Sequence, residues 1–186
     1  MAHSSPDTAA CAPDPRAITL GLESKFNPPA LETSQVVRAS LCETICRSEG
    51  QLVLVHAPAG FGKSTAMMQA RERLEELGVA TAWLTLDRAD NDVSRFLNCL
   101  DTAVRQLGRI THTHSPGADT VQALTRIETP FALFLDEFEA IHEAALLVIV
   151  REIAHNLPRH GHLVIGSRSL PQIGSARLRV RGQLTQ

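Results

Sequence analysis

The sequence predicts an α/β fold with a mainly parallel β-sheet. Short apolar runs alternate along the chain with longer segments whose apolar residues recur at helical spacing. The run FALFL at residues 131–135 contains no polar residue, which is typical of a strand covered on both faces. The chain has 186 residues, of which 44% are apolar and 20% charged, so it is long enough for one globular domain with a sizeable core.

The expected elements follow one another in a regular order. A helix begins near Ser34 and ends before Gly50, where a glycine stops the helical pattern. Further helices are expected at residues 63–77, 93–107, 120–127 and 144–156, and residues 88–92 form a turn that caps the second of these. Apolar runs rich in β-branched residues predict strands at residues 51–56, 79–86, 131–135 and 162–166, with a fifth beginning within residues 180–184.

Composition excludes several classes of protein. The formal net charge of -2 gives no overall field that would attract nucleic acid or an anionic membrane. The longest apolar run, residues 144–150, is far shorter than the roughly 18 to 20 residues that cross a bilayer. The first fifteen residues lack the cationic start and apolar stretch of a secretory signal. We therefore expect a cytoplasmic protein with no membrane contact.

The sharpest motif lies between the first predicted strand and the helix that follows it. The sequence APAGFGKST at residues 57–65 matches the P-loop pattern G-x-x-x-x-G-K-[ST], except that Ala57 stands in place of the first glycine. Glycines let the backbone curl so that its N–H groups point at phosphate oxygens, and the helix N-terminus adds partial positive charge. The candidate nucleotide-binding residues are Ala57, Pro58, Ala59, Gly60, Phe61, Gly62, Lys63, Ser64 and Thr65.

These residue types predict binding of ATP or ADP with Mg²⁺. We expect Lys63 to bridge the β- and γ-phosphates, Ser64 to offer its hydroxyl to Mg²⁺, and Thr65 to lie nearer the α-phosphate. The alternative is an ordinary turn between a strand and a helix.

Two carboxylates follow the apolar strand at residues 131–135. In a P-loop protein, an acid at this position holds the magnesium shell, so Asp136 is the candidate metal ligand. Glu137 is the candidate general base for the attacking water, and Glu139 is a competing carboxylate. The alternative is that these acids are simply solvated.

The strand at residues 162–166 is followed by Ser167 and Arg168. In open α/β folds, ligands bind at the carboxyl ends of the strands, so Arg168 is a candidate sensor of the γ-phosphate. The alternative is a surface arginine that ends a strand.

Six segments in order resemble the N-terminal nucleotide-binding domain of MalT-like, LuxR-type transcriptional regulators of the STAND class. The likeness covers roughly residues 24–186 and is carried by SKFNPPALETSQVVR, LVHAPAGFGKST, AWLTLDRADNDVSRFL, FLDEFEAI, LVIGSRSLP and ARLRVRGQL. The resemblance implies a P-loop NTPase three-layer sandwich that works as an ATP/ADP switch. The resting form would hold ADP, and exchange for ATP, prompted by an inducer, would permit self-association and activation of transcription.

The resemblance also implies roles for individual residues. It places Lys63 and Ser64 at the phosphates and Mg²⁺, Asp136 on the metal and Arg168 in the sensor position. It further implies that Arg38 lies near the adenine pocket.

The sequence departs from the family pattern in two ways. Glu137 follows Asp136 where two aspartates are frequent, which leaves a hydrolytic role for Glu137 open. The sequence ends at Gln186, without the lid and winged-helix portion and without a recognition helix, so these residues are not expected to bind specific DNA. The expected organisation is a flexible arm over residues 1–23, without periodicity, and a P-loop NTPase domain over residues 24–186 that is incomplete at its C-terminus.

Three functions fit this pattern. The first is a nucleotide-binding switch module with slow ATP hydrolysis at most. The second is a small stand-alone P-loop ATPase or kinase. The third is a silent truncated fragment, in which a missing fifth strand and lid leave the phosphate side of the pocket open to water.

Overall fold

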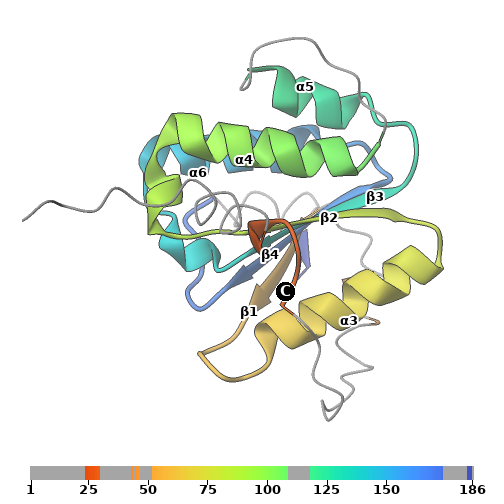
Figure 1. The fold of residues 1–186 in the computed structure, drawn as a ribbon, viewed down its shortest axis with the longest axis horizontal. Coiled ribbons are helices and arrows are strands. Elements are labelled where there is room, and N and C mark those ends of the chain that lie inside the picture. Colours follow the sequence, from red (N-terminus) through yellow and green to blue (C-terminus); the bar gives the residue numbers. More distant parts are fainter. Residues whose placement is uncertain are drawn as a thin grey trace, which may run out of the picture.

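A computed structural model describes residues 24–29, 43, 45–46, 52–108, 118–173 and 184–185. Within this part of the chain, five strands form one sheet in the order β2-β3-β4-β1-β5, and every neighbouring pair is parallel (Figure 1). The strands are β1 (Leu52–His56), β2 (Ala80–Thr85), β3 (Phe131–Asp136), β4 (Gly161–Ser167) and β5 (Leu184–Thr185). The predicted parallel sheet is therefore confirmed.

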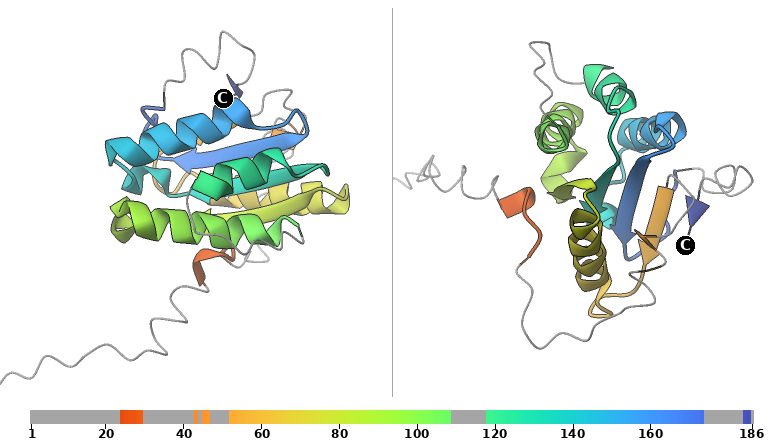
Figure 2. Two further views of the ribbon diagram at one scale, coloured as in Figure 1. Left: turned by 90° about the horizontal axis from the view of Figure 1, so that it is seen from above. Right: turned by 90° about the vertical axis from the view of Figure 1, so that its right-hand side faces the viewer.

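Helices cover both faces of this sheet. Helix α3 lies on one face, whereas α4, α5 and α6 lie side by side on the other (Figures 1 and 2). The helices are α3 (Lys63–Glu76), α4 (Val93–Gln106), α5 (Ala118–Thr125) and α6 (Ala144–Asn156), and two short 3₁₀ turns are η1 (Arg88–Asn91) and η2 (Phe138–Ala140). The arrangement is the predicted three-layer sandwich, with α5 beginning two residues earlier than expected.

Alternation along the strands divides the core into two halves. In β3, Phe131, Leu133 and Leu135 pack toward α4, α5 and α6, whereas Ala132 and Phe134 pack toward α3. Trp83 of β2 is fully buried on the α3 side and stacks on Phe134, with ring centroids 5.6 Å apart. Both faces of the central strands are thus dry, which explains their uninterrupted apolar sequences.

The predicted fifth strand is confirmed at Leu184, and the missing fifth strand that the silent-fragment alternative assumes is not borne out. Strand β5 pairs with β1 in parallel, with Leu184 opposite Leu52 and Thr185 opposite Val53. The other residues of the predicted strand at 180–184, the predicted arm at residues 1–23 and Arg38 lie outside the described residues. Of the helix expected from Ser34, the described residues Glu43, Ile45 and Cys46 are helical. No helix in the described part of the chain is long and apolar enough to cross a membrane.

The topology brings three predicted motifs to one edge of the sheet. Strand β1 lies between β4 and β5, so the chain leaves β1 to build one side of the sheet and returns to form the other. In such sheets, ligands bind at the carboxyl ends of the strands where the order reverses. That edge carries residues 57–62 after β1, Asp136 at the end of β3 and Arg168 after β4.

A close approach between strands gives a test of this packing. Gly161 of β4 lies opposite Phe131 of β3, and an added Cβ would come within 2.6 Å of Cζ of the fully buried Phe131 ring. Because the ring has no free space to move into, we expect Gly161→Ala to lower the free energy of unfolding by about 1–3 kcal/mol. Urea denaturation followed by circular dichroism measures this loss.

Relief of the clash provides the control. In the double variant Gly161→Ala with Phe131→Leu, the smaller side chain makes room for the new methyl group, so the combined loss should be less than the sum of the two single losses. Strict additivity would contradict the assigned contact.

Candidate functional site

The loop between β1 and α3 is bent by two glycines. Gly60 and Gly62 have φ angles of 79° and 75°, in the left-handed region that favours glycine. Gly62 is also the N-cap of α3, and no side chain forms a capping hydrogen bond there. At its base the loop is tied to the end of β4, because the N–H of Ala57 donates to the carbonyl of Ser167 over 3.3 Å. The loop is thus fixed at its base and uncapped by side chains at the start of the helix.

A cavity of about 280 Å³ opens at this loop. It combines the P-loop residues with one acid that follows β3 and the arginine that follows β4. Its lining residues are Pro58, Ala59, Gly60, Gly62, Lys63, Ser64, Thr65, Glu137 and Arg168. Ala57 and Phe61 are not part of the lining, and the Phe61 side chain at the loop tip is 62% exposed. Three motifs that are far apart in the sequence therefore meet in one concave site.

Lys63 is buried in an ion pair with the end of β3. Its Nζ donates to Oδ1 of Asp136 over 2.5 Å and to Oε1 of Glu137 over 3.4 Å. The side chains of Lys63 and Asp136 are only 5% and 3% exposed, so each depends on the other for charge compensation. The same Asp136 oxygen also accepts the N–H of Glu137 over 2.9 Å. Glu137 has a φ of 56°, an uncommon conformation for a residue other than glycine.

Arg168 is held by two glutamates. Its Nη2 donates to Oε2 of Glu137 over 2.8 Å, and its Nε lies 2.7 Å from Oε1 of Glu139. Its backbone N–H donates to Oε2 of Glu139 over 3.0 Å. Burial acts to raise the pKa of Glu139, but the N–H groups of Glu139 and Arg168, a hydrogen bond with Glu137 and the charge of Lys63 hold that pKa below its usual value. Glu139 therefore stays ionised at neutral pH and positions Arg168, a role that the sequence alone did not indicate.

A second cavity of about 420 Å³ adjoins the first. The two cavities share Ser64 and Glu137, and the second also reaches Asp136 and Thr85 at the ends of β3 and β2. Its outer wall consists of residues from the segment that precedes the predicted domain helix, namely Ser24, Asn27, Pro28 and Pro29. Sequence reasoning did not place this segment, residues 24–29, beside the acids.

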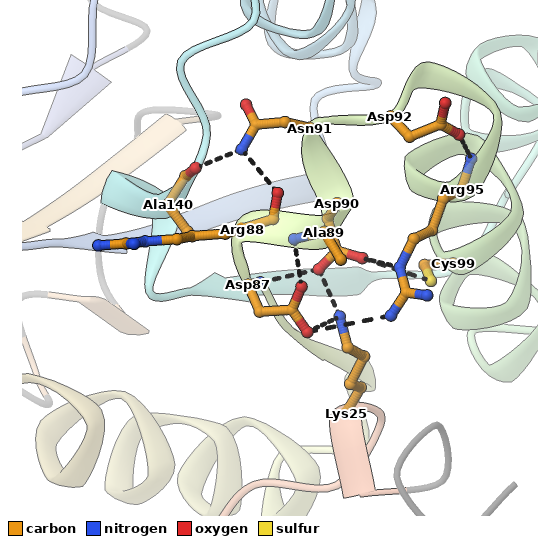
Figure 3. A network of polar contacts seen from close by, with 10 residues as sticks. All are labelled: Lys25, Asp87, Arg88, Ala89, Asp90, Asn91, Asp92, Arg95, Cys99 and Ala140. Carbon is orange, nitrogen blue, oxygen red and sulfur yellow. Dashed lines mark hydrogen bonds and ion pairs between the residues drawn. The ribbon is translucent and has the colours of Figure 1, made fainter. Parts of the chain in front are cut away.

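A buried ionic network anchors residues 24–29 (Figure 3). Asp90 of η1 has no exposed surface, and its carboxylate contacts Nζ of Lys25 and, over 3.1 Å, Nε of Arg95. Lys25 also lies 2.7 Å from Oδ2 of Asp87. Burial acts to raise the pKa of Asp87, but bonds from Lys25 and Ala89 hold it below its usual value. Lys25 and Asp90 are 65 residues apart, so only the fold brings them together.

The predicted turn at residues 88–92 is confirmed. The side chain of Asp87 accepts the N–H of Ala89 over 2.8 Å and caps η1. The side chain of Asp92 accepts the N–H of Arg95 over 2.8 Å and caps α4. Asp87 and Asp92 thus serve as helix caps, as the sequence predicts.

Two residues that line the second cavity fit Mg²⁺. The Ser64 hydroxyl and the Asp136 carboxylate are hard oxygen donors, which this ion prefers. Among the described residues, no group of three or more His, Cys, Asp or Glu could hold a metal. Mg²⁺ is usually bound by one or two carboxylates together with phosphate oxygens and water, and one serine hydroxyl and one aspartate fit that pattern. Gly166 of β4 leaves room for the acid, because an added Cβ would lie 2.7 Å from Oδ1 of Asp136.

Two known proteins each contain a stretch that is similar to this sequence. Serine/threonine-protein kinase PknK of Mycobacterium tuberculosis is 29% identical over 174 residues, which cover 85% of this chain and 16% of PknK. The HTH-type transcriptional regulator MalT of Klebsiella pneumoniae is 29% identical over 183 residues, which cover 89% of this chain and 20% of MalT. The chain thus spans 16% to 20% of the length of these relatives, and the resemblance to the N-terminal part of MalT-like regulators is confirmed.

Solved structures share the fold. A chain in the structure of Drosophila ORC bound to AT-rich DNA and Cdc6 superposes with a TM-score of 0.50 at 14% identity, covering 91% of this chain and 54% of that one. The sequence model of the AAA domain family matches residues 32–161, which is most of the chain. Sequence, sheet order and the P-loop edge therefore agree that this chain belongs to the AAA domain family.

Proposed function

We propose that this chain binds ATP and ADP with Mg²⁺ as the nucleotide-dependent switch module of a LuxR/MalT-type transcriptional regulator. The observation that carries the proposal is the meeting of Lys63, Ser64, Glu137 and Arg168 in one cavity at the P-loop. Membership of the AAA domain family supports nucleotide binding in general. The switch role rests on the likeness to MalT.

Each group at the site has a task in this proposal. The backbone of residues 57–62 and the start of α3 bind phosphate oxygens, and Lys63 adds a positive charge at the terminal phosphates. Ser64 and Asp136 hold Mg²⁺, which when bound neutralises phosphate charge. Arg168 responds to the γ-phosphate, and Arg38, outside the described residues, contacts the adenine.

The contacts of Glu137 support slow hydrolysis at most. Its two carboxylate oxygens contact different cations, Oε1 the ammonium of Lys63 and Oε2 the guanidinium of Arg168. Either oxygen would have to orient an attacking water while it also holds a cation, and the cation lowers its basicity. We therefore assign Glu137 a weak catalytic role, in which it works as a base only when Lys63 and Arg168 turn toward phosphate.

The two relatives support a nucleotide-binding module that both proteins contain, rather than a final activity that both perform. One carries the name of a kinase and the other of a transcriptional regulator, yet they match almost the same length of this chain at the same identity. The common part is thus best explained as the nucleotide-binding unit. We place the protein in the cytoplasm and propose that its ATP-bound form self-associates, as the resemblance implies.

The first test removes the P-loop charge. We expect Lys63→Ala to weaken ATP binding by tenfold to a hundredfold, because a hydrogen bond to a charged group contributes about 1.5–3 kcal/mol. Isothermal titration of wild type and variant with ATP and ADP in Mg²⁺ measures the change. Wild type that binds neither nucleotide at millimolar concentration would contradict the proposed function.

Arg73→Ala is the matched control for this change. Arg73 lies on the same helix, is exposed and pairs with Glu76 on the helix surface, so its removal takes away one positive charge without touching the cavity. Its ATP affinity should equal that of wild type. Because Lys63→Ala leaves the buried Asp136 carboxylate without its ammonium, urea denaturation of the same variant is measured to separate lost binding from lost stability.

The second test concerns the metal. We expect Ser64→Ala to reduce the gain in ATP affinity that Mg²⁺ gives over EDTA by about tenfold, because the hydroxyl is one of two protein ligands in the proposal. ATP titrations with and without Mg²⁺ measure that gain. Ser94→Ala removes an exposed hydroxyl from α4 and should leave it unchanged. An equal Mg²⁺ effect in wild type and Ser64→Ala would show that Ser64 does not bind the metal.

A further inference from the structure

One side chain of η1 holds the loop that carries the two glutamates. Asn91, the last residue of η1, donates from Nδ2 to the carbonyl of Ala140 over 2.6 Å and to that of Arg88 over 3.2 Å (Figure 3). Its Oδ1 accepts the N–H groups of His142 and Glu143 over 3.0 and 3.1 Å. Both ends of the amide are therefore used, and three of the four bonds reach across to the segment that follows β3.

That segment, residues 137–143, links β3 to α6 and contains Glu137 and Glu139, the two glutamates that hold Arg168. It starts in the left-handed conformation of Glu137, continues through η2 and ends at Glu143, the N-cap of α6. The buried side chains of Phe138 and Ile141 anchor this segment to the hydrophobic core. Among the described residues, Asn91 is the residue of η1 whose side chain hydrogen-bonds to the backbone of this segment.

The residues on both sides of Asn91 are held by side-chain contacts. The residue before it, Asp90, is fully buried and bonded to Lys25, to Arg95 and, over 2.8 Å, to the N–H of Asp87. The residue after it, Asp92, caps α4. Side-chain bonds on both sides thus hold the backbone of Asn91, so its amide can set the place of another segment.

We propose that Asn91 is a positioning residue of the nucleotide site, acting through residues 137–143. By fixing the carbonyl of Ala140 and the N–H groups of His142 and Glu143, it sets where Glu137 and Glu139 hold Arg168. The proposal rests on the proposed function. Arg168 lies where a γ-phosphate would be sensed, so Asn91 controls the preference for ATP over ADP rather than nucleotide binding as such.

The experiment compares the ratio of ATP to ADP affinity in Mg²⁺ for wild type and three variants. Asn91→Ala removes every side-chain bond, and we expect the ratio to fall about tenfold while ADP affinity stays within about twofold of wild type. Asn91→Asp keeps the accepting oxygen but places a second oxygen against the carbonyls of Ala140 and Arg88, which repel it, so the ratio should also fall. Asn98→Ala, an exposed position on α4, makes the same change away from the loop and should have no effect.

The possible results distinguish failure of the proposed function from failure of the role proposed for Asn91. If wild type binds no nucleotide, the proposed function fails and the role of Asn91 fails with it. If wild type binds nucleotide and Asn91→Ala keeps the same ratio, the role of Asn91 alone is overturned. An equal loss of ATP and ADP affinity also overturns it, because that loss reflects a general loss of structure. If Asn91→Ala does not fold by circular dichroism, an unchanged ratio in Asn91→Asp overturns the role and a lowered ratio supports it.

Discussion

The buried ion pair between Lys63 and Asp136 is the interaction on which the site depends. It joins the first residue of α3 to the last residue of β3, which are 73 residues apart in sequence. Breaking such a pair from one side costs about 3–5 kcal/mol, because a charge is left buried without compensation. The pair therefore fixes the start of α3 against the sheet. It also places the P-loop amides beside the acids.

The shape of the sheet edge decides which acids can share this pair. Strand β4 lies next to β3 and ends in a glycine followed by Ser167, so no side chain at Gly166 competes with the Asp136 carboxylate for space. The chain then turns at Arg168, whose guanidinium reaches back to the segment after β3. One cation from the start of α3 and one that follows β4 thus converge on the acids after β3, and neither can move without releasing a glutamate.

The sequence predicted the fold more completely than the contacts of the site. Apolar runs define buried strands because both faces of a central strand must be dry, and β1 to β4 lie within two residues of their predicted ranges. The places of Gly60, Gly62 and Asp136 were predictable because the motif indicates a bend between a strand and a helix and an acid at the end of a buried strand. The contacts of Lys25 and Asn91 were not predictable, because the sequence of a polar turn does not indicate which distant residue a polar side chain will contact. Their partners lie 65 and 49 residues away, where only tertiary structure brings them.

The charge balance of the site favours the proposed joint binding of nucleotide and Mg²⁺. Lys63 and Arg168 supply two positive charges, and Asp136, Glu137 and Glu139 supply three negative ones, which leaves one negative charge in excess. A polyphosphate alone would add negative charge to a partly buried negative cluster, where Coulomb repulsion is strong. A bound divalent cation would make the net charge of this cluster positive. The positions of Glu137 and Glu139 set how much of this negative charge Arg168 can offset. Asn91 holds the loop that carries both glutamates, so it affects the charge balance of the site from a distance.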